Sequence, residues 1–105
     1  DYHDMANVKV YENYEECYKD LKQHRHFAVT TKAKKHYHQL SYEVGDVFIF
    51  GPETRGLPPE RLKDERNYAN IRIPMVASNR SMNFSNTVAV VMFEAWRQIN
   101  FIEGV

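Results

Sequence analysis

Two polar loops hold the side chains with which this chain could do chemistry. The first, GPETRG (51–56), places Glu53 and Arg55 between two glycines, directly after the apolar run VFIF. Glycine lets a ligand approach the backbone closely, although a tight turn with a surface Glu–Arg pair explains the same pattern. The second, SNRSMNFSN (78–86), supplies hydroxyls and amides that bind sugars, phosphates or backbone groups, or that simply cap the next helix. Since each loop follows a predicted strand, one hypothesis is a shared ligand site at the carboxyl ends of the strands.

Alternating strands and helices would position these loops. Apolar or alternating runs predict strands at 7–11, 26–31, 46–50 and 69–75. Helices are predicted from a cap at Asn13 to about His24, over 58–62, and over 87–98 with Ser85 or Asn83 as its cap. The polar stretch 32–46 reads as a loop with a weak strand. The order predicts one α/β domain over 1–105, with a parallel sheet.

The last predicted helix, 87–98, is apolar on nearly every side of its first turns. Such a helix is normally buried all round. In so small a domain, we therefore expect a partner subunit to cover one of its faces.

Composition excludes several classes of protein. With 14 Lys+Arg and 14 Asp+Glu, the chain has no net charge, so any nucleic-acid surface must be a local patch. The single cysteine, Cys17, excludes an internal disulfide and a cysteine-based zinc site. No apolar run approaches the roughly 20 residues that span a bilayer.

Two basic patterns have competing interpretations. The pairs His24/His26 and His36/His38 have spacing that could bind a metal, but no carboxylate or cysteine completes a set, and solvated loop histidines are the favoured interpretation. The cluster KAKK (32–35), together with Arg55, Arg72 and Arg80, could touch phosphates. By itself it is first interpreted as a solvated surface.

Three stretches together point to a known family. FGPETRGLP (50–58), IRIPM (71–75) and RSMNFSNTVAVVMFEAWRQ (80–98) resemble the SPOUT-superfamily RNA methyltransferases. They are most similar to the tRNA 2′-O-methyltransferases that act on the wobble-position pyrimidine. The resemblance covers essentially the whole chain. It implies a parallel α/β sheet with a C-terminal trefoil knot, and a homodimer whose active site lies at the subunit interface. It also implies a cytoplasmic enzyme that takes its methyl group from S-adenosyl-L-methionine, needs no metal, and modifies a ribose 2′-hydroxyl of tRNA.

The resemblance also implies roles for individual residues. The cofactor pocket would include Val29, Gly51, Ile73 and Ser81. The catalytic positions, which would orient the ribose and the methionine group of the cofactor, are Glu53, Ser81 and Asn83. Arg55 and Arg80 would contact phosphates of the RNA.

One departure from the family pattern bears on activity. Relatives begin with a strand, a helix and a further strand, which carry an Asn-Thr-Gly-Asn motif and an arginine one helical turn later. Nothing in this sequence replaces them, so we expect an N-terminally truncated family member whose own activity and cofactor binding stay open. Two alternatives remain: a catalytically inactive RNA-binding or dimerisation module of the same fold, and a 2′-O-methyltransferase for rRNA or another tRNA position.

Overall fold

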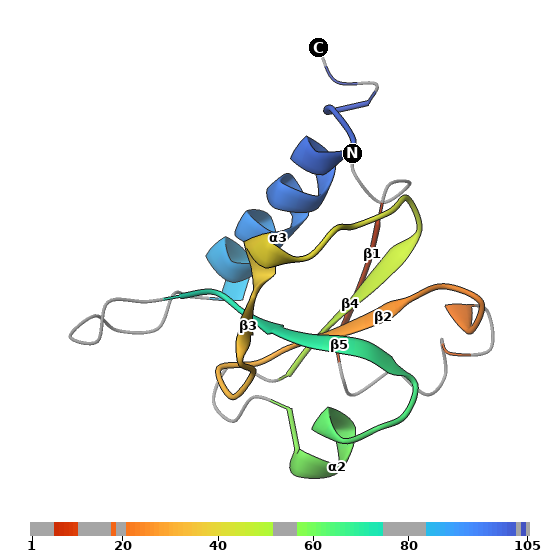
Figure 1. The fold of residues 1–105 in the computed structure, drawn as a ribbon, viewed down its shortest axis with the longest axis vertical. Coiled ribbons are helices and arrows are strands. Elements are labelled where there is room, and N and C mark those ends of the chain that lie inside the picture. Colours follow the sequence, from red (N-terminus) through yellow and green to blue (C-terminus); the bar gives the residue numbers. More distant parts are fainter. Residues whose placement is uncertain are drawn as a thin grey trace.

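One parallel sheet organises the chain (Figure 1). The structure, a computed structural model, describes residues 6–10, 18, 21–51, 57–74, 84–102 and 104, without the side chains of 6–10, 84 and 85. The strands, in the order β1-β4-β2-β5-β3 across the sheet, are all parallel. Their bounds are β1 Ala6–Val10, β2 His26–Val29, β3 Lys35–His36, β4 Asp46–Phe50 and β5 Asn67–Arg72. The predicted parallel α/β sheet is thus confirmed.

The helix α3 (Phe84–Gln98) covers one face of this sheet (Figure 1). Alternate residues of the strands point toward it, as the period of a strand requires. Val91, Met92 and Ala95 of α3 are buried among them. The strand side of this cluster consists of Phe27, Phe48, Phe50 and Ile71.

The opposite face carries a smaller core beside the short helix α2 (Pro59–Leu62). Val47 and Ile49 of β4 point this way and are fully buried. Leu57 and Leu62 pack on them from the α2 segment, and Tyr18 and Leu21 from the chain before β2. Because both faces of β4 are covered, all five of its residues are buried, which explains the apolar run that follows Asp46.

The strand bounds differ from prediction mainly in β5. It begins at Asn67 and ends at Arg72, whereas 69–75 was expected. β5 ends there because its neighbouring strands end: β2 ends where Val29 pairs with Ile71, and β3 ends where His36 pairs with Arg72. Pro74, moreover, has no N–H to extend the ladder. The weak strand expected within 32–46 is β3, followed by a 3-10 turn over Tyr37–Gln39.

The last helix corrects one expectation. It begins at Phe84, so Ser85 lies within it and is not its cap, while Asn83 lies outside the described residues. Within one chain the helix leaves one face exposed, and the partner subunit expected to cover such a face stays a prediction. Phe93 is 47% exposed, because the sheet covers only the face that carries Val91, Met92 and Ala95.

The helix predicted from Asn13 to about His24 falls largely outside the described residues. Tyr18 and Leu21, the described members of its apolar face, are helical and half-buried against the second core cluster. Among the described residues, no helix is both long and apolar enough to cross a membrane.

Candidate cofactor and RNA site

Three of the expected cofactor residues meet at the carboxyl edge of the sheet. Val29 ends β2 and lies between Phe50 of β4 and Ile71 of β5 in the strand register. Gly51 directly follows Phe50, and Ile73 directly follows the end of β5. Three adjacent strands, β4-β2-β5, therefore bring Val29, Gly51 and Ile73 to one edge, where ligands of open parallel sheets bind.

The chemistry of this edge suits a flat, partly apolar ligand. Val29 and Ile73 are half-buried and pack on the α3 core cluster, so each keeps some apolar surface at the strand end. The N–H of Thr30 donates to the carbonyl of Ile71 at 2.8 Å, which ties the ends of β2 and β5 together. Gly51, also half-buried, presents no side chain there. An adenine ring fits such a surface of apolar side chains and backbone groups.

The remaining expected site residues lie outside the described residues. These are Glu53, Arg55, Arg80, Ser81 and Asn83. They belong to the segments 52–56 and 75–83, which follow Gly51 and Pro74 in the sequence. Their roles stay predictions.

A buried arginine anchors the element that follows the glycine loop. Arg61 of α2 is 2% exposed. Its guanidinium donates to Asp64 at 2.9 Å and also to the side-chain oxygen of Asn67. Asn67 in turn donates to the Arg61 carbonyl at 2.9 Å, and Asn70 to the Leu62 carbonyl at the same distance. This network joins α2 to the start of β5.

The sequence did not single out this network. Arg61 lies in PERLKDERNY, whose charges are typical of a solvated turn. The only available signal was the pair of asparagines at the start of a strand, where amides are uncommon.

The last residue of α3 is hydrogen-bonded to the segment between the 3-10 turn and β4. The Gln98 side chain accepts from the Tyr42 N–H at 2.8 Å and donates to the Leu40 carbonyl at 2.9 Å. Tyr42 is buried against Phe27 and Phe48, and its hydroxyl donates to the Tyr37 carbonyl. Burial raises the pKa of the Tyr42 hydroxyl above its ordinary range, so the tyrosine stays neutral.

The histidines do not behave as one class. The interpretation as solvated loop residues is wrong for His26, which is 1% exposed at the start of β2. Its Nε2 lies 2.8 Å from the Leu21 carbonyl. Burial lowers the pKa of His26, and the positive charges of Arg61 and Arg66 act in the same direction, against the Leu21 hydrogen bond. Within the part of the chain that the structure describes, no three His, Cys, Asp or Glu side chains come together as a metal site.

Comparisons with known proteins identify the family. The model of the SpoU rRNA Methylase family matches residues 1–93. The tRNA (cytidine(34)-2'-O)-methyltransferase of Methylovorus glucosotrophus (strain SIP3-4) is 47% identical over 105 residues, which are 100% of this chain and 68% of that protein. The chain belongs to the SpoU methylase family. This finding confirms the resemblance drawn from the sequence motifs.

Solved structures of SpoU-type enzymes share the fold. One, described as "Structural insights into the 2-OH methylation of C/U34 on tRNA", is 36% identical with a TM-score of 0.66, over 73% of this chain and 46% of that one. Another, an AdoMet-bound rRNA methyltransferase from Sinorhizobium meliloti, is 24% identical with a TM-score of 0.67, over 80% of this chain and 33% of that one. The chain spans between 64% and 68% of the length of the curated relatives it matches.

Proposed function

We propose that the protein transfers a methyl group from S-adenosyl-L-methionine to the ribose 2′-hydroxyl of cytidine or uridine at the wobble position, 34, of tRNA. The observation that carries this is the similarity along the full chain to a tRNA (cytidine(34)-2'-O)-methyltransferase. The sheet supports it, because Val29, Gly51 and Ile73 share one edge in a fold of that family.

The residues of the chain would act mainly by positioning. When bound, the cofactor supplies an electrophilic methyl group on a sulfonium. Val29 and Ile73 would hold the adenosine through their remaining apolar surface, and Gly51 would let backbone groups approach it. Glu53, Ser81 and Asn83 would orient the ribose hydroxyl and the methionine group. Holding two reactants in line accelerates such a transfer without further chemistry by the protein.

The proposal also includes a trefoil knot, contacts to tRNA phosphates and a homodimer. A trefoil knot would join the segments that leave β4 and β5, and Arg55 and Arg80 would contact tRNA phosphates. A homodimer would cover the side of α3 that the sheet leaves exposed. The rings of Phe93 and Trp96, 5.8 Å apart on α3, support this, because Phe93 is 47% exposed. A cytoplasmic location follows from the tRNA substrate.

The direct test is transfer of a labelled methyl group to unmodified tRNA, followed by mass spectrometry of the nucleoside at position 34. We expect 2′-O-methylation there with the protein. The Asn83→Ala variant should lose it, whereas a matched change of an exposed amide, Gln23→Ala, should keep it. Absence of transfer to any tRNA by the wild-type protein would refute the enzymatic proposal.

A second substrate class is favoured by one observation, the description of the matching family as rRNA methylases. Labelled transfer to ribosomal RNA, but not to tRNA, would replace the tRNA proposal. Binding of S-adenosylhomocysteine without transfer to either RNA would instead indicate an inactive module of the same fold.

A further inference from the structure

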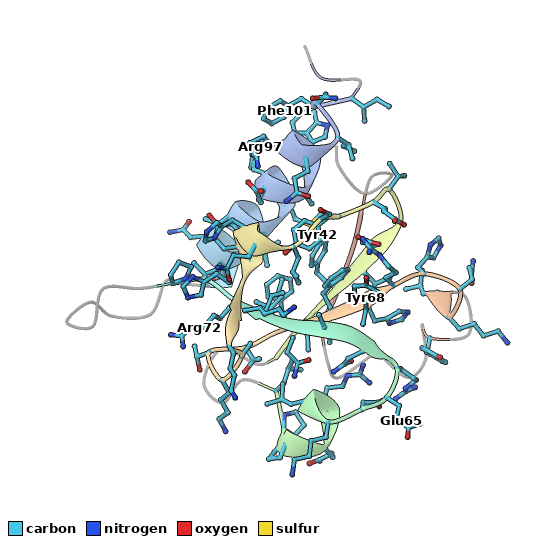
Figure 2. The ribbon with its side chains drawn as sticks, in the orientation of Figure 1. Tyr42, Glu65, Tyr68, Arg72, Arg97 and Phe101 are labelled. Atoms are coloured by element: carbon cyan, nitrogen blue, oxygen red, sulfur yellow. The ribbon has the colours of Figure 1, made fainter. Side chains whose placement is uncertain are left out.

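A strip of basic side chains lies along one edge of the sheet, where β3 is the outermost strand. We call this strip the β3 edge and define it by Lys32, Lys34, Lys35 and Arg72. The register pairs Lys35 with Ile71 and His36 with Arg72. The strip therefore lies beside the carboxyl end of β5, next to Ile73 of the candidate cofactor site. Figure 2 shows Arg72 at this end of β5 and Glu65 beyond its other end.

The charges of the β3 edge have no internal counter-ions within the described part of the chain. Lys32, Lys34 and Lys35 are exposed, and no ion pair is formed by any of them there. The sequence from 21 to 42 contains no aspartate or glutamate. The acidic residues that balance the charge of the whole chain thus lie outside the segment that carries these lysines. This separation along the sequence favours a local positive potential at the β3 edge.

Arg72 adds a donor that the described residues leave unused. Its Nε is buried and finds no hydrogen-bond partner among them. The Nε of Arg61 is in the same state, so Arg72 is included in the β3 edge for its charge and for its place at the end of β5. The planar fork of a guanidinium suits a phosphate, which accepts two hydrogen bonds at once.

The turn that carries the lysines is ordered before any ligand binds. The N–H of Lys32 donates to Thr30 Oγ1 at 3.1 Å, and the N–H of Ala33 donates to the Thr30 carbonyl at 3.4 Å. Ala33 is buried, while Lys32 and Lys34 on either side of it are exposed. The turn therefore places the side chains of Lys32 and Lys34 on the solvent side.

From these observations we infer that the β3 edge binds backbone phosphates of the RNA substrate and guides the strand toward the cofactor edge. The inference rests on the proposed function, which it deepens by naming a contact surface made mainly of Lys32, Lys34 and Lys35, outside the site residues that the resemblance implies. The number of basic groups favours RNA over a small anion, because several cations can contact successive phosphates of one strand.

The test compares two double variants of the same protein. Lys32→Ala/Lys34→Ala removes two charges from the β3 edge. Lys22→Ala/Lys63→Ala removes two exposed charges elsewhere. Affinity for unmodified tRNA is measured by fluorescence anisotropy over a series of salt concentrations, and affinity for S-adenosylhomocysteine by calorimetry.

We expect the β3-edge variant to bind tRNA roughly tenfold more weakly at low salt, with a salt slope smaller by about one for each lysine removed. The control variant should match the wild type, and cofactor affinity should be unchanged in both. Arg72→Lys, which keeps the charge but loses the fork, should weaken binding with little change of slope.

Other outcomes would overturn the inference. Equal losses in both double variants would indicate an effect of net charge alone, and no loss in either would leave the β3 edge a solvated surface. Loss of cofactor affinity in the β3-edge variant would assign the lysines to the methionine carboxylate. Charge-dependent binding to phosphatidylserine vesicles but not to tRNA would assign them to a membrane. If tRNA binding depends on these lysines but no methyl group is transferred, the proposed function fails and the inference stands.

Discussion

Within the described part of the chain, basic side chains are paired with carboxylates at one end of the sheet and are unpaired at the other. At the amino end, Arg25 binds Asp46 through two hydrogen bonds of 3.1 and 2.7 Å, and Arg61 binds Asp64 at 2.9 Å. At the carboxyl end, the lysines of the β3 edge form no ion pair within the described part of the chain.

This difference separates charges that hold the fold from charges that serve a ligand. Asp46 and Arg61 are each 2% exposed, so their partners are needed to offset the loss of water. Exposed ammonium groups keep their hydration and are free to exchange it for phosphate oxygens. Substitutions at the amino end should therefore change stability, and those at the carboxyl end should change binding.

The largest effect is expected at Arg61. Arg61→Ala leaves a cavity in the α2 side of the core and removes hydrogen bonds from Asp64 and Asn67. The free energy of unfolding, measured in urea, should fall by about 3 kcal/mol. The exposed neighbour Lys63 provides the control, because Lys63→Ala should stay within about 0.5 kcal/mol of wild type. Equal losses of unfolding free energy in the two variants would show that the buried contacts of Arg61 do not stabilise the fold.

A smaller loss is expected at Asp46. Asp46→Ala removes both hydrogen bonds from Arg25 and one from the Glu43 N–H at 2.8 Å. Because these bonds involve a charged acceptor, unfolding should become easier by about 2 kcal/mol. Glu43→Ala is the matched control, since that carboxylate lies 3.8 Å from the same arginine but is 70% exposed. Similar losses in urea titrations of both would contradict a specific role for the buried pair.

The amino end should also carry a pH dependence through His26. Its pKa is lowered in the folded state by burial, so the unfolded chain binds a proton more readily as the pH falls below about 6.5. Stability should therefore be full at neutral pH and should fall on acidification through that window. Urea unfolding at several pH values should show that His26→Gln loses this slope, while the exposed His38→Gln keeps it. A slope unchanged in His26→Gln would assign it to other groups.

The smallest effect on stability is expected at the β3 edge. Lys32→Ala/Lys34→Ala removes two exposed charges without a described ion pair, so the free energy of unfolding should change by no more than about 0.5 kcal/mol. Circular dichroism on heating should therefore show a melting temperature close to that of the wild type. A large destabilisation would mean that these lysines support the fold, and the contrast between the two ends of the sheet would disappear.

Much of the fold was predictable where burial and sequence period agree. β4 was predicted with its observed bounds, because a strand covered on both faces is apolar throughout, and Asp46 and Gly51 mark its ends. The end of β5 was not predictable, because Ile73 continues the pattern of alternation and only the lengths of the neighbouring strands stop it.

Only part of the candidate site was both predicted from the sequence and placed by the structure. Val29, Gly51 and Ile73 came from motifs, and the strand order places them at one edge. The roles of Glu53, Arg55, Arg80, Ser81 and Asn83 stay predictions. The burial of His26 was not predictable from the histidine pattern, because it depends on tertiary packing that brings its ring to the carbonyl of Leu21.

The amino-acid sequence determined the strands, their parallel class and the family, since these follow from local patterns of hydrophobicity and from short motifs. Only the tertiary structure decided which charges are paired. Arg25 and the lysines of the β3 edge look alike in sequence, but Asp46, at the start of the neighbouring strand β4, binds Arg25, whereas no described carboxylate pairs with the lysines. Pairing depends on which strands become neighbours, and that is a property of the assembled sheet.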